Sequence, residues 1–173
     1  MAVITAWMAS QAIHADDMNL IITLDRADLQ RRIDRMFPLV RKNELVTVRM
    51  HHPQVILTEH SGRIGLRVRL DATAAEGFSI SGLAGIDGVL RFAGDTGNFY
   101  LNDARIEELQ IDGVPALYAD QIRRLADGIV SELLQERPVY TLGQMGESKR
   151  IMGGEIRSIE VHDGKLVVEL AMP

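Results

Sequence analysis

Cysteine is absent from the 173 residues of this chain. Its absence excludes disulfides, thiolate metal ligands, thiol nucleophiles and a lipid attached through cysteine. Aromatic residues are also few (one Trp, three Tyr and four Phe), and the net charge is −5. A nucleic-acid groove needs positive charge and stacking side chains, so we expect no nucleic-acid partner. No run of residues approaches the roughly 20 apolar positions of a membrane-spanning helix, so membrane contact is expected to be peripheral at most.

The composition that remains is that of a globular protein, 46 % hydrophobic and 25 % charged. This length can bury one sizeable core, and we expect a single domain over residues 16–173. Residues 1–15 are apolar from position 3 to 9, and Ala12 or Ala15 could end a cleavage site. This pattern indicates a truncated secretory signal peptide without its basic segment, and the alternative is an ordinary N-terminal helix. An exported chain without cysteine would be soluble in the periplasm.

Residues 25–42 show the apolar stripe of an amphipathic helix. The stripe positions recur at helical spacing, and Asp25 stands where an N-cap residue would accept a backbone hydrogen bond. Pro38 falls inside the pattern and is expected to kink the last turn, because proline lacks an N–H and clashes with the preceding turn. The stripe consists of Leu29, Ile33, Met36, Phe37 and Val40.

Alternating patterns predict antiparallel strands over residues 44–50, 54–60, 63–71, 78–92 and 98–111. The clearest runs through residues 63–71, where apolar residues alternate with arginines, as on a sheet with one buried and one wet face. A bulge is expected at Glu107–Glu108, where the alternation breaks. Gly82 and Gly88 share the inward parity of their strand. They either relieve a bend in a coiled sheet or leave room for a helix or a ligand.

The last third of the chain predicts a second helix and a hairpin. Pro115 suits the first turn of a helix that Pro138 ends. Residues 155–170 read as a hairpin whose Asp163-Gly164 centre favours a type I′ turn. Together these elements predict an α+β fold in which a long N-terminal helix is cradled by a strongly curved antiparallel sheet, with a second helix and a C-terminal hairpin.

No catalytic or metal-binding motif stands out. His51, His52 and His60 lie near the ends of a predicted hairpin, but adjacent histidines on a continuous strand point to opposite faces and cannot readily hold one ion. The paired carboxylates Glu107 and Glu108 diverge for the same reason, and there is no nucleophile elbow. We therefore expect no catalytic residues, no metal and no cofactor.

The apolar faces provide the remaining functional hypothesis. If a cleft stays open between the first helix and the sheet, it would accept an acyl chain or another hydrophobic molecule. The alternative is a dry, filled core, and periodicity cannot separate the two. The residues expected to line the cleft are Leu29, Ile33, Met36, Phe37, Val48, Met50, Leu66, Val68, Ile80 and Ile86.

From about residue 19 to the C-terminus the chain resembles the YceB-like family of bacterial envelope lipoproteins, a domain of unknown function. The resemblance lies in LIITLDRADLQRRIDRMFP, PQVILTEHSGRIGLRVRLDA, FYLNDARIEELQIDGVP, RPVYTLG and IRSIEVHDGKLVVEL. It implies a helix held in a curved antiparallel sheet, similar to the tubular lipid-binding (TULIP) superfamily, and it brings no catalytic residues. The lipidated cysteine of such lipoproteins is missing here.

Three functions follow as hypotheses. The first is a non-enzymatic periplasmic protein that binds a lipid or other hydrophobic ligand between the first helix and the sheet. The second is an envelope protein–protein adaptor with a solid core. The third is a hydrolase acting on lipid or glycan, which would need a converging triad or metal cluster.

Overall fold

Strands make up most of the molecule. The computed structural model describes residues 19–141 and 155–171. The predicted signal segment (residues 1–15) lies outside the described residues.

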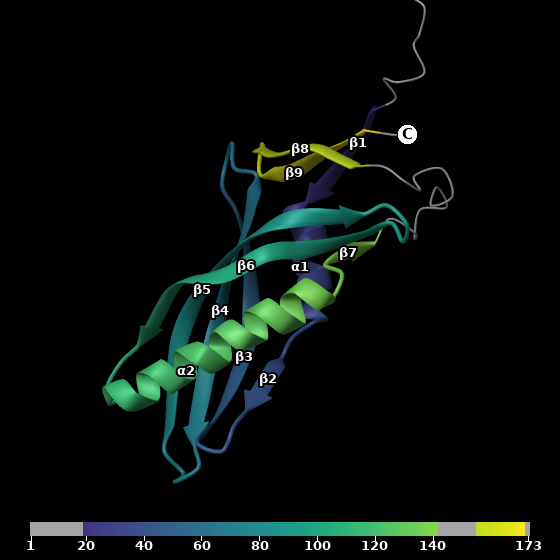
Figure 1. Cartoon of the computed structure of the whole chain (residues 1–173). Helices are drawn as coiled ribbons and strands as arrows, with labels where there is room; N and C mark the ends of the chain where they lie inside the picture. Colours follow the sequence, from purple (N-terminus) through teal and green to yellow (C-terminus); the bar gives the residue numbers. More distant parts are fainter. Residues whose placement is uncertain (1–18, 142–154, 172–173) are drawn as a thin grey trace, which may run out of the picture.

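Two antiparallel sheets organise the described chain (Figure 1). The larger has the strand order β2-β3-β4-β5-β6-β7 and the smaller the order β1-β9-β8. The strands of the larger sheet are β2 (Leu39–Lys42), β3 (Val46–Leu57), β4 (Arg63–Ala74), β5 (Ser79–Ala93), β6 (Asn98–Ile111) and β7 (Tyr140–Thr141). Those of the smaller are β1 (Asn19–Asp25), β8 (Glu155–His162) and β9 (Lys165–Ala171).

The predicted long N-terminal helix is wrong. The helix α1 covers only Arg26–Asp34, and the chain then turns and enters β2. Pro38 explains the early end, because it cannot donate within a helix and it disfavours helical backbone at Phe37. Val40, placed on the helical stripe by its spacing, lies instead on β2 and is 52 % exposed. Asp25 occupies the N-cap position without a side-chain capping bond, and its carboxylate meets Lys165 Nζ at 3.2 Å.

The helix that covers the large sheet is the second one. Helix α2 (Ala116–Gly128) continues without a break into a π-helical segment, η2 (Ile129–Leu134), and together they lie across the sheet (Figure 1). Ile122, Ala126, Ile129, Val130 and Leu134 are at most 1 % exposed. The fold is therefore mostly β, with two short helices, and the sheet does not cradle an N-terminal helix.

The strand patterns over residues 63–71, 78–92 and 98–111 are confirmed, but the hairpin expected from residues 44–50 and 54–60 is wrong, because residues 46–57 form the single strand β3. On β4, Ile64, Leu66, Val68 and Leu70 are buried on the face toward the helices, which we call the inner face. The register between β5 and β6 passes from Gly85–Glu108 to Ile86–Ile106, so Glu107 is the extra residue of the predicted bulge.

Neighbouring strand atoms occupy the space that the inward glycines leave. A Cβ at Gly82 would lie 2.3 Å from the Gln110 carbonyl oxygen, and one at Gly88 would lie 2.6 Å from Leu101 Cγ. Both glycines therefore allow β6 to approach β5 closely, rather than leaving room for a ligand.

The C-terminal hairpin is confirmed and is linked to the large sheet. Asp163 and Gly164 both have positive φ (51° and 69°), as a type I′ turn requires. The turn after β3 contacts the hairpin through two hydrogen bonds. His60 N–H donates to the Val161 carbonyl at 3.0 Å, and Gly164 N–H donates to Glu59 Oε1 at 2.7 Å.

Candidate functional site

The ten residues predicted to line a cleft belong to one apolar cluster. Seven of them are at most 3 % exposed, and the other three are partly buried against the same cluster. The buried ones are Leu29, Ile33, Val48, Met50, Leu66, Val68 and Ile86. The partly buried ones are Met36, Phe37 and Ile80.

Three of the ten, Leu29, Ile33 and Leu66, surround a small hollow between α1 and the inner face of the sheet. Its volume is about 10 Å³, close to the minimum for a single water molecule. Ligand sites for drug-sized molecules are usually about 300–1,000 Å³. Every residue around the hollow is apolar, so it favours a hydrocarbon over water. Its lining is Leu29, Ile33, Val55, Ile64, Leu66, Leu101 and Val139.

The α1 wall of the hollow is firmly attached. Gln30 donates from Nε2 to the Pro53 carbonyl at 2.6 Å and accepts from the Val55 N–H at 2.8 Å. These bonds satisfy backbone groups of β3 at an irregularity in its pairing, which lies between His51 and Gln54. Removing them would leave partly buried polar groups unpaired, so α1 is not the wall expected to move.

The wall at Val139 belongs to a short segment at the edge of the large sheet, where Thr141 Oγ1 also donates to Asn98 Oδ1 at 2.8 Å. The Val139 N–H donates to the Phe99 carbonyl at 2.8 Å, and the adjoining strand β7 pairs through only two residues. Side-chain packing adds to this: Val139 and Tyr140 are 2 % and 6 % exposed, and the Arg32 guanidinium lies 4.1 Å from the centroid of the Tyr140 ring. This short segment is the simplest place for the hollow to open.

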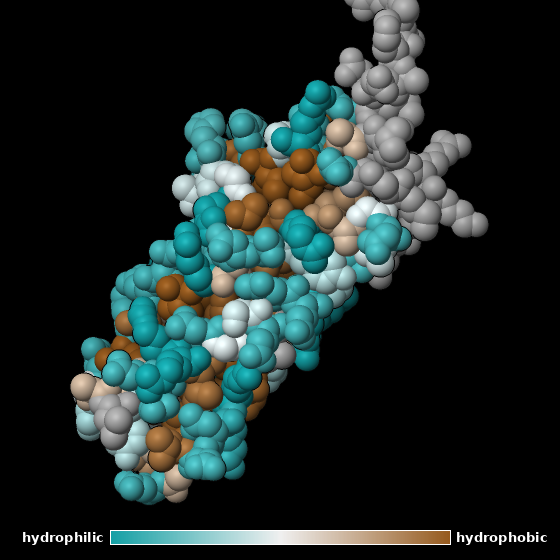
Figure 2. Space-filling view, viewed as in Figure 1, coloured by the Kyte–Doolittle hydropathy of each residue, from teal (hydrophilic) through white to brown (hydrophobic). Residues whose placement is uncertain are grey.

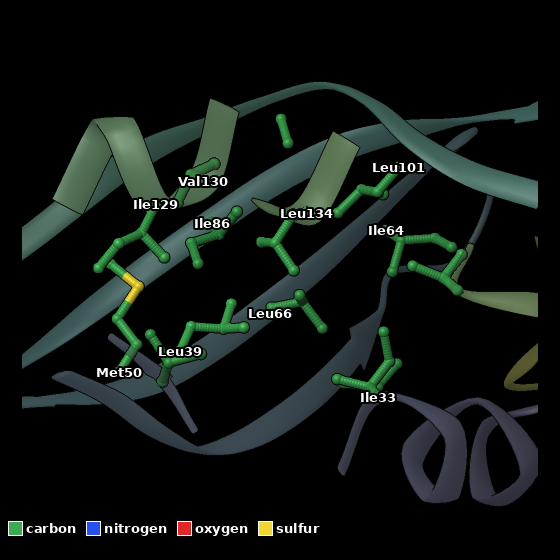
Figure 3. Packing of buried hydrophobic residues seen from close by; sticks show 14 of the residues in the cluster. Ile33, Leu39, Met50, Ile64, Leu66, Ile86, Leu101, Ile129, Val130 and Leu134 are labelled. Carbon is green, nitrogen blue, oxygen red and sulfur yellow. The ribbon is translucent and has the colours of Figure 1, made fainter. Parts of the chain in front are cut away.

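The rest of the inner face is filled by the helices. Figure 3 shows Ile129, Val130 and Leu134 pointing from the helix toward the residues of the sheet, among them Met50 and Ile86. Arg41 on β2 fixes this arrangement from outside by contacting the Glu132 carboxylate and donating to the Gly128 carbonyl at 3.3 Å. The hydrogen bond from Arg41 lowers the pKa of Glu132.

Sequence reasoning missed four residues of the hollow. Val55, Ile64 and Leu101 lie on strands whose alternation was recognised, so their inward parity could have identified them. Val139 gave no such signal, because it lies between a proline and a two-residue strand.

The two adjacent histidines converge, contrary to the expectation that they point to opposite faces. The strand is irregular at this point, and His52 has a φ of 50°. Their ring centroids lie 4.6 Å apart, with the two Nδ1 atoms in contact. They border a surface recess of about 290 Å³, together with Asp34, Phe37, Pro38, Arg49 and Pro53.

The polar contacts around His51 do not form a catalytic triad. His51 Nε2 lies 2.8 Å from Asp71 Oδ2, while Ser81 Oγ donates to Asp71 Oδ1 at 2.6 Å. The serine therefore bonds the carboxylate and not a histidine nitrogen, so this cluster has no contact between a nucleophile and a base. The hydrogen bond from Ser81, followed by the contact with His51, lowers the pKa of Asp71. Across residues 19–141 and 155–171, no three His, Asp or Glu side chains converge as metal ligands.

In a comparison with known protein families, residues 11–165 match a family described as a protein of unknown function (DUF1439). The chain belongs to the DUF1439 family. No curated protein matches the chain. No described helix of this DUF1439 protein is long and apolar enough to cross a membrane.

Proposed function

We propose that this DUF1439 protein is a non-enzymatic binding protein that takes up a lipid acyl chain or another hydrophobic ligand between α1 and the inner face of the large sheet. One observation carries the proposal: a hollow lined only by apolar side chains lies at that place, beside a wall held by a two-residue strand. A volume of about 10 Å³ admits no acyl chain, so binding requires this wall to move.

The energies allow such a movement. Exposing a buried valine such as Val139 costs about 1.5–3 kcal/mol, whereas each methylene group of a bound chain contributes about 0.8 kcal/mol. Roughly two to four buried methylene groups therefore offset the exposure of Val139 alone. Opening the wall also breaks the Val139–Phe99 hydrogen bond and exposes Tyr140, so binding favours a long acyl chain over a short or polar ligand.

The resemblance to YceB-like envelope lipoproteins supports the same proposal through their similarity to the tubular lipid-binding superfamily, whose members hold lipids in a groove. In keeping with that resemblance, we propose that the protein is exported to the periplasm.

Native mass spectrometry of the full chain, purified without organic solvent, tests this function. We expect an added mass that corresponds to an acyl species, and its recovery in a lipid extract. A single unliganded mass, together with no uptake of added oleate, would contradict the proposal.

The second candidate is an envelope protein–protein adaptor. The closed inner face favours it, because a filled core needs no ligand. Figure 2 also shows apolar surface at the end of the molecule where β8 and β9 lie, and the small sheet contributes partly buried Ile22, Ile156 and Ile159. Capture of one specific envelope protein by a DUF1439 protein that takes up no oleate would favour this second function.

A further inference from the structure

We propose that His51 and His52 form a binding site for a divalent first-row transition metal ion, with Cu²⁺ the preferred ion. Their two Nδ1 atoms are in contact at the edge of the recess described above. Two imidazole nitrogens suit copper, nickel and zinc, and the general order of affinities for such ligands places Cu²⁺ highest. The site is independent of the proposed binding of an acyl chain.

The backbone of β3 creates this arrangement. On a regular strand the two rings would lie on opposite faces, but the pairing of β3 with β4 is irregular between His51 and Gln54. His52 has a φ of 50°, which non-glycine residues seldom adopt. Irregular strand positions of this kind often redirect side chains at functional sites. Here the irregularity brings both rings to one side.

The contact with Asp71 prepares His51 as a ligand. His51 Nε2–H donates to Asp71 Oδ2 at 2.8 Å, which fixes the tautomer and leaves the lone pair of Nδ1 directed toward His52. Histidines that bind metals usually donate their second N–H to a carboxylate in this way. Ser81 Oγ in turn holds Asp71 at 2.6 Å, so the orientation of His51 is supported by a chain of hydrogen bonds.

The electrostatic surroundings and the open geometry define the class of site. Carboxylates from Asp34, on the recess, and Asp71, behind His51, favour a cation, while Arg49 on the same recess opposes it. In the metal-free site His52 Nδ1–H donates to the lone pair of His51 Nδ1, so metal binding requires the His52 proton to move from Nδ1 to Nε2 by exchange with water, after which both imidazoles bind as neutral rings. With two protein ligands the ion keeps water in its other positions, so we expect an exchangeable site rather than a closed structural one.

Titration of the untagged full chain with Cu²⁺, followed by calorimetry and electron paramagnetic resonance, tests the inference. We expect one saturable site with nitrogen hyperfine coupling. His51→Ala and His52→Ala should each abolish the site, and Asp71→Asn should weaken binding by about 10–100-fold, as for other second-sphere carboxylates.

The matched control replaces the other three histidines of the chain, as His14→Ala/His60→Ala/His162→Ala. It includes the pair His60 and His162, whose rings lie 5.6 Å apart. This variant should bind Cu²⁺ like the unsubstituted chain. Loss of binding in the control, or unchanged binding in a folded His52→Ala variant, would overturn the assignment. Circular dichroism verifies that each variant is folded.

Discussion

Substitution of Leu66 by alanine is the most informative perturbation of the hollow. Leu66 is 0 % exposed, lies on β4 and lines the hollow. Leu→Ala removes a buried isopropyl group, and substitutions of this kind cost about 2–5 kcal/mol, rising by about 24 cal/mol for each Å³ of residual cavity. Because space already exists beside Leu66, the surroundings cannot close it completely, and we expect a cost of about 3–5 kcal/mol.

The matched control is Leu70→Ala on the same strand. Leu70 is also 0 % exposed on the inner face of β4, but it does not line the hollow. Urea unfolding followed by circular dichroism should give losses of at least 2 kcal/mol for both variants. Thermal midpoints should fall by roughly 6–20 °C for Leu66→Ala, given about 2–4 °C per kcal/mol at this chain length.

Leu66→Ala and Leu70→Ala are expected to lose similar stability, but they should differ in their affinity for a fatty acid. The void left by Leu66→Ala joins the hollow, so less of the wall must move before an acyl chain enters. A fluorescent fatty acid should therefore bind Leu66→Ala more tightly than the unsubstituted chain, and Leu70→Ala should bind like the unsubstituted chain. Equal binding by the two variants would refute the place of the hollow in ligand uptake.

Two further predictions test the sheet. Gly82→Ala should lower the free energy of unfolding by about 1–3 kcal/mol, because its Cβ would meet the backbone carbonyl of Gln110. Gly85→Ala, whose Cβ would lie 3.4 Å from its nearest neighbour, should change stability by no more than about 0.5 kcal/mol; a larger loss there in urea unfolding would contradict this reasoning. The second prediction concerns Asp71, whose pKa lies below its ordinary value of 3.8 chiefly through the bond from Ser81. Its ionised form therefore contributes stability that is present above pH 3.8 and is lost as the pH falls through the lowered pKa. Between about pH 5 and about pH 2, the free energy of unfolding of Ser81→Ala should fall by less than that of the unsubstituted chain. The control Ser79→Ala should show the same fall as the unsubstituted chain. Identical pH profiles for all three proteins would show that the hydrogen bond from Ser81 does not act on Asp71.

The sequence predicted β4, β5 and β6 well because alternation is a local property, but it wrongly divided β3 into two strands around Pro53. On β4 each inward residue differs from its neighbours in polarity, and the break at Glu107 marked the bulge that the structure contains. The turn at Asp163-Gly164 was predictable because a type I′ turn requires positive φ at both central positions, and few residues other than glycine, asparagine and aspartate adopt it readily.

The arrangement of the helices was not predictable to the same degree. The apolar spacing from Leu29 to Val40 fits a helix, but Pro38 ends the helical backbone and Val40 enters a strand. Local periodicity also does not say which helix the sheet faces, and the longer α2 with η2 takes that place. The seven-residue lining of the hollow depends on contacts between distant elements, so the spacing of Leu29, Ile33 and Leu66 indicated only part of it. The convergence of His51 and His52 depends on the irregular pairing of β3 with β4, which no pattern of residues in the sequence predicts.

The proposed function requires a hydrophobic chain to bind between α1 and the inner face of the large sheet. Isotope-filtered nuclear Overhauser spectroscopy of the methyl-labelled protein with unlabelled oleate tests it most directly. We expect contacts from the acyl chain to the methyl groups of Ile33 and Leu66, and none to Leu70. Contacts confined to surface residues such as Val40, or no contacts with oleate in excess, would contradict it.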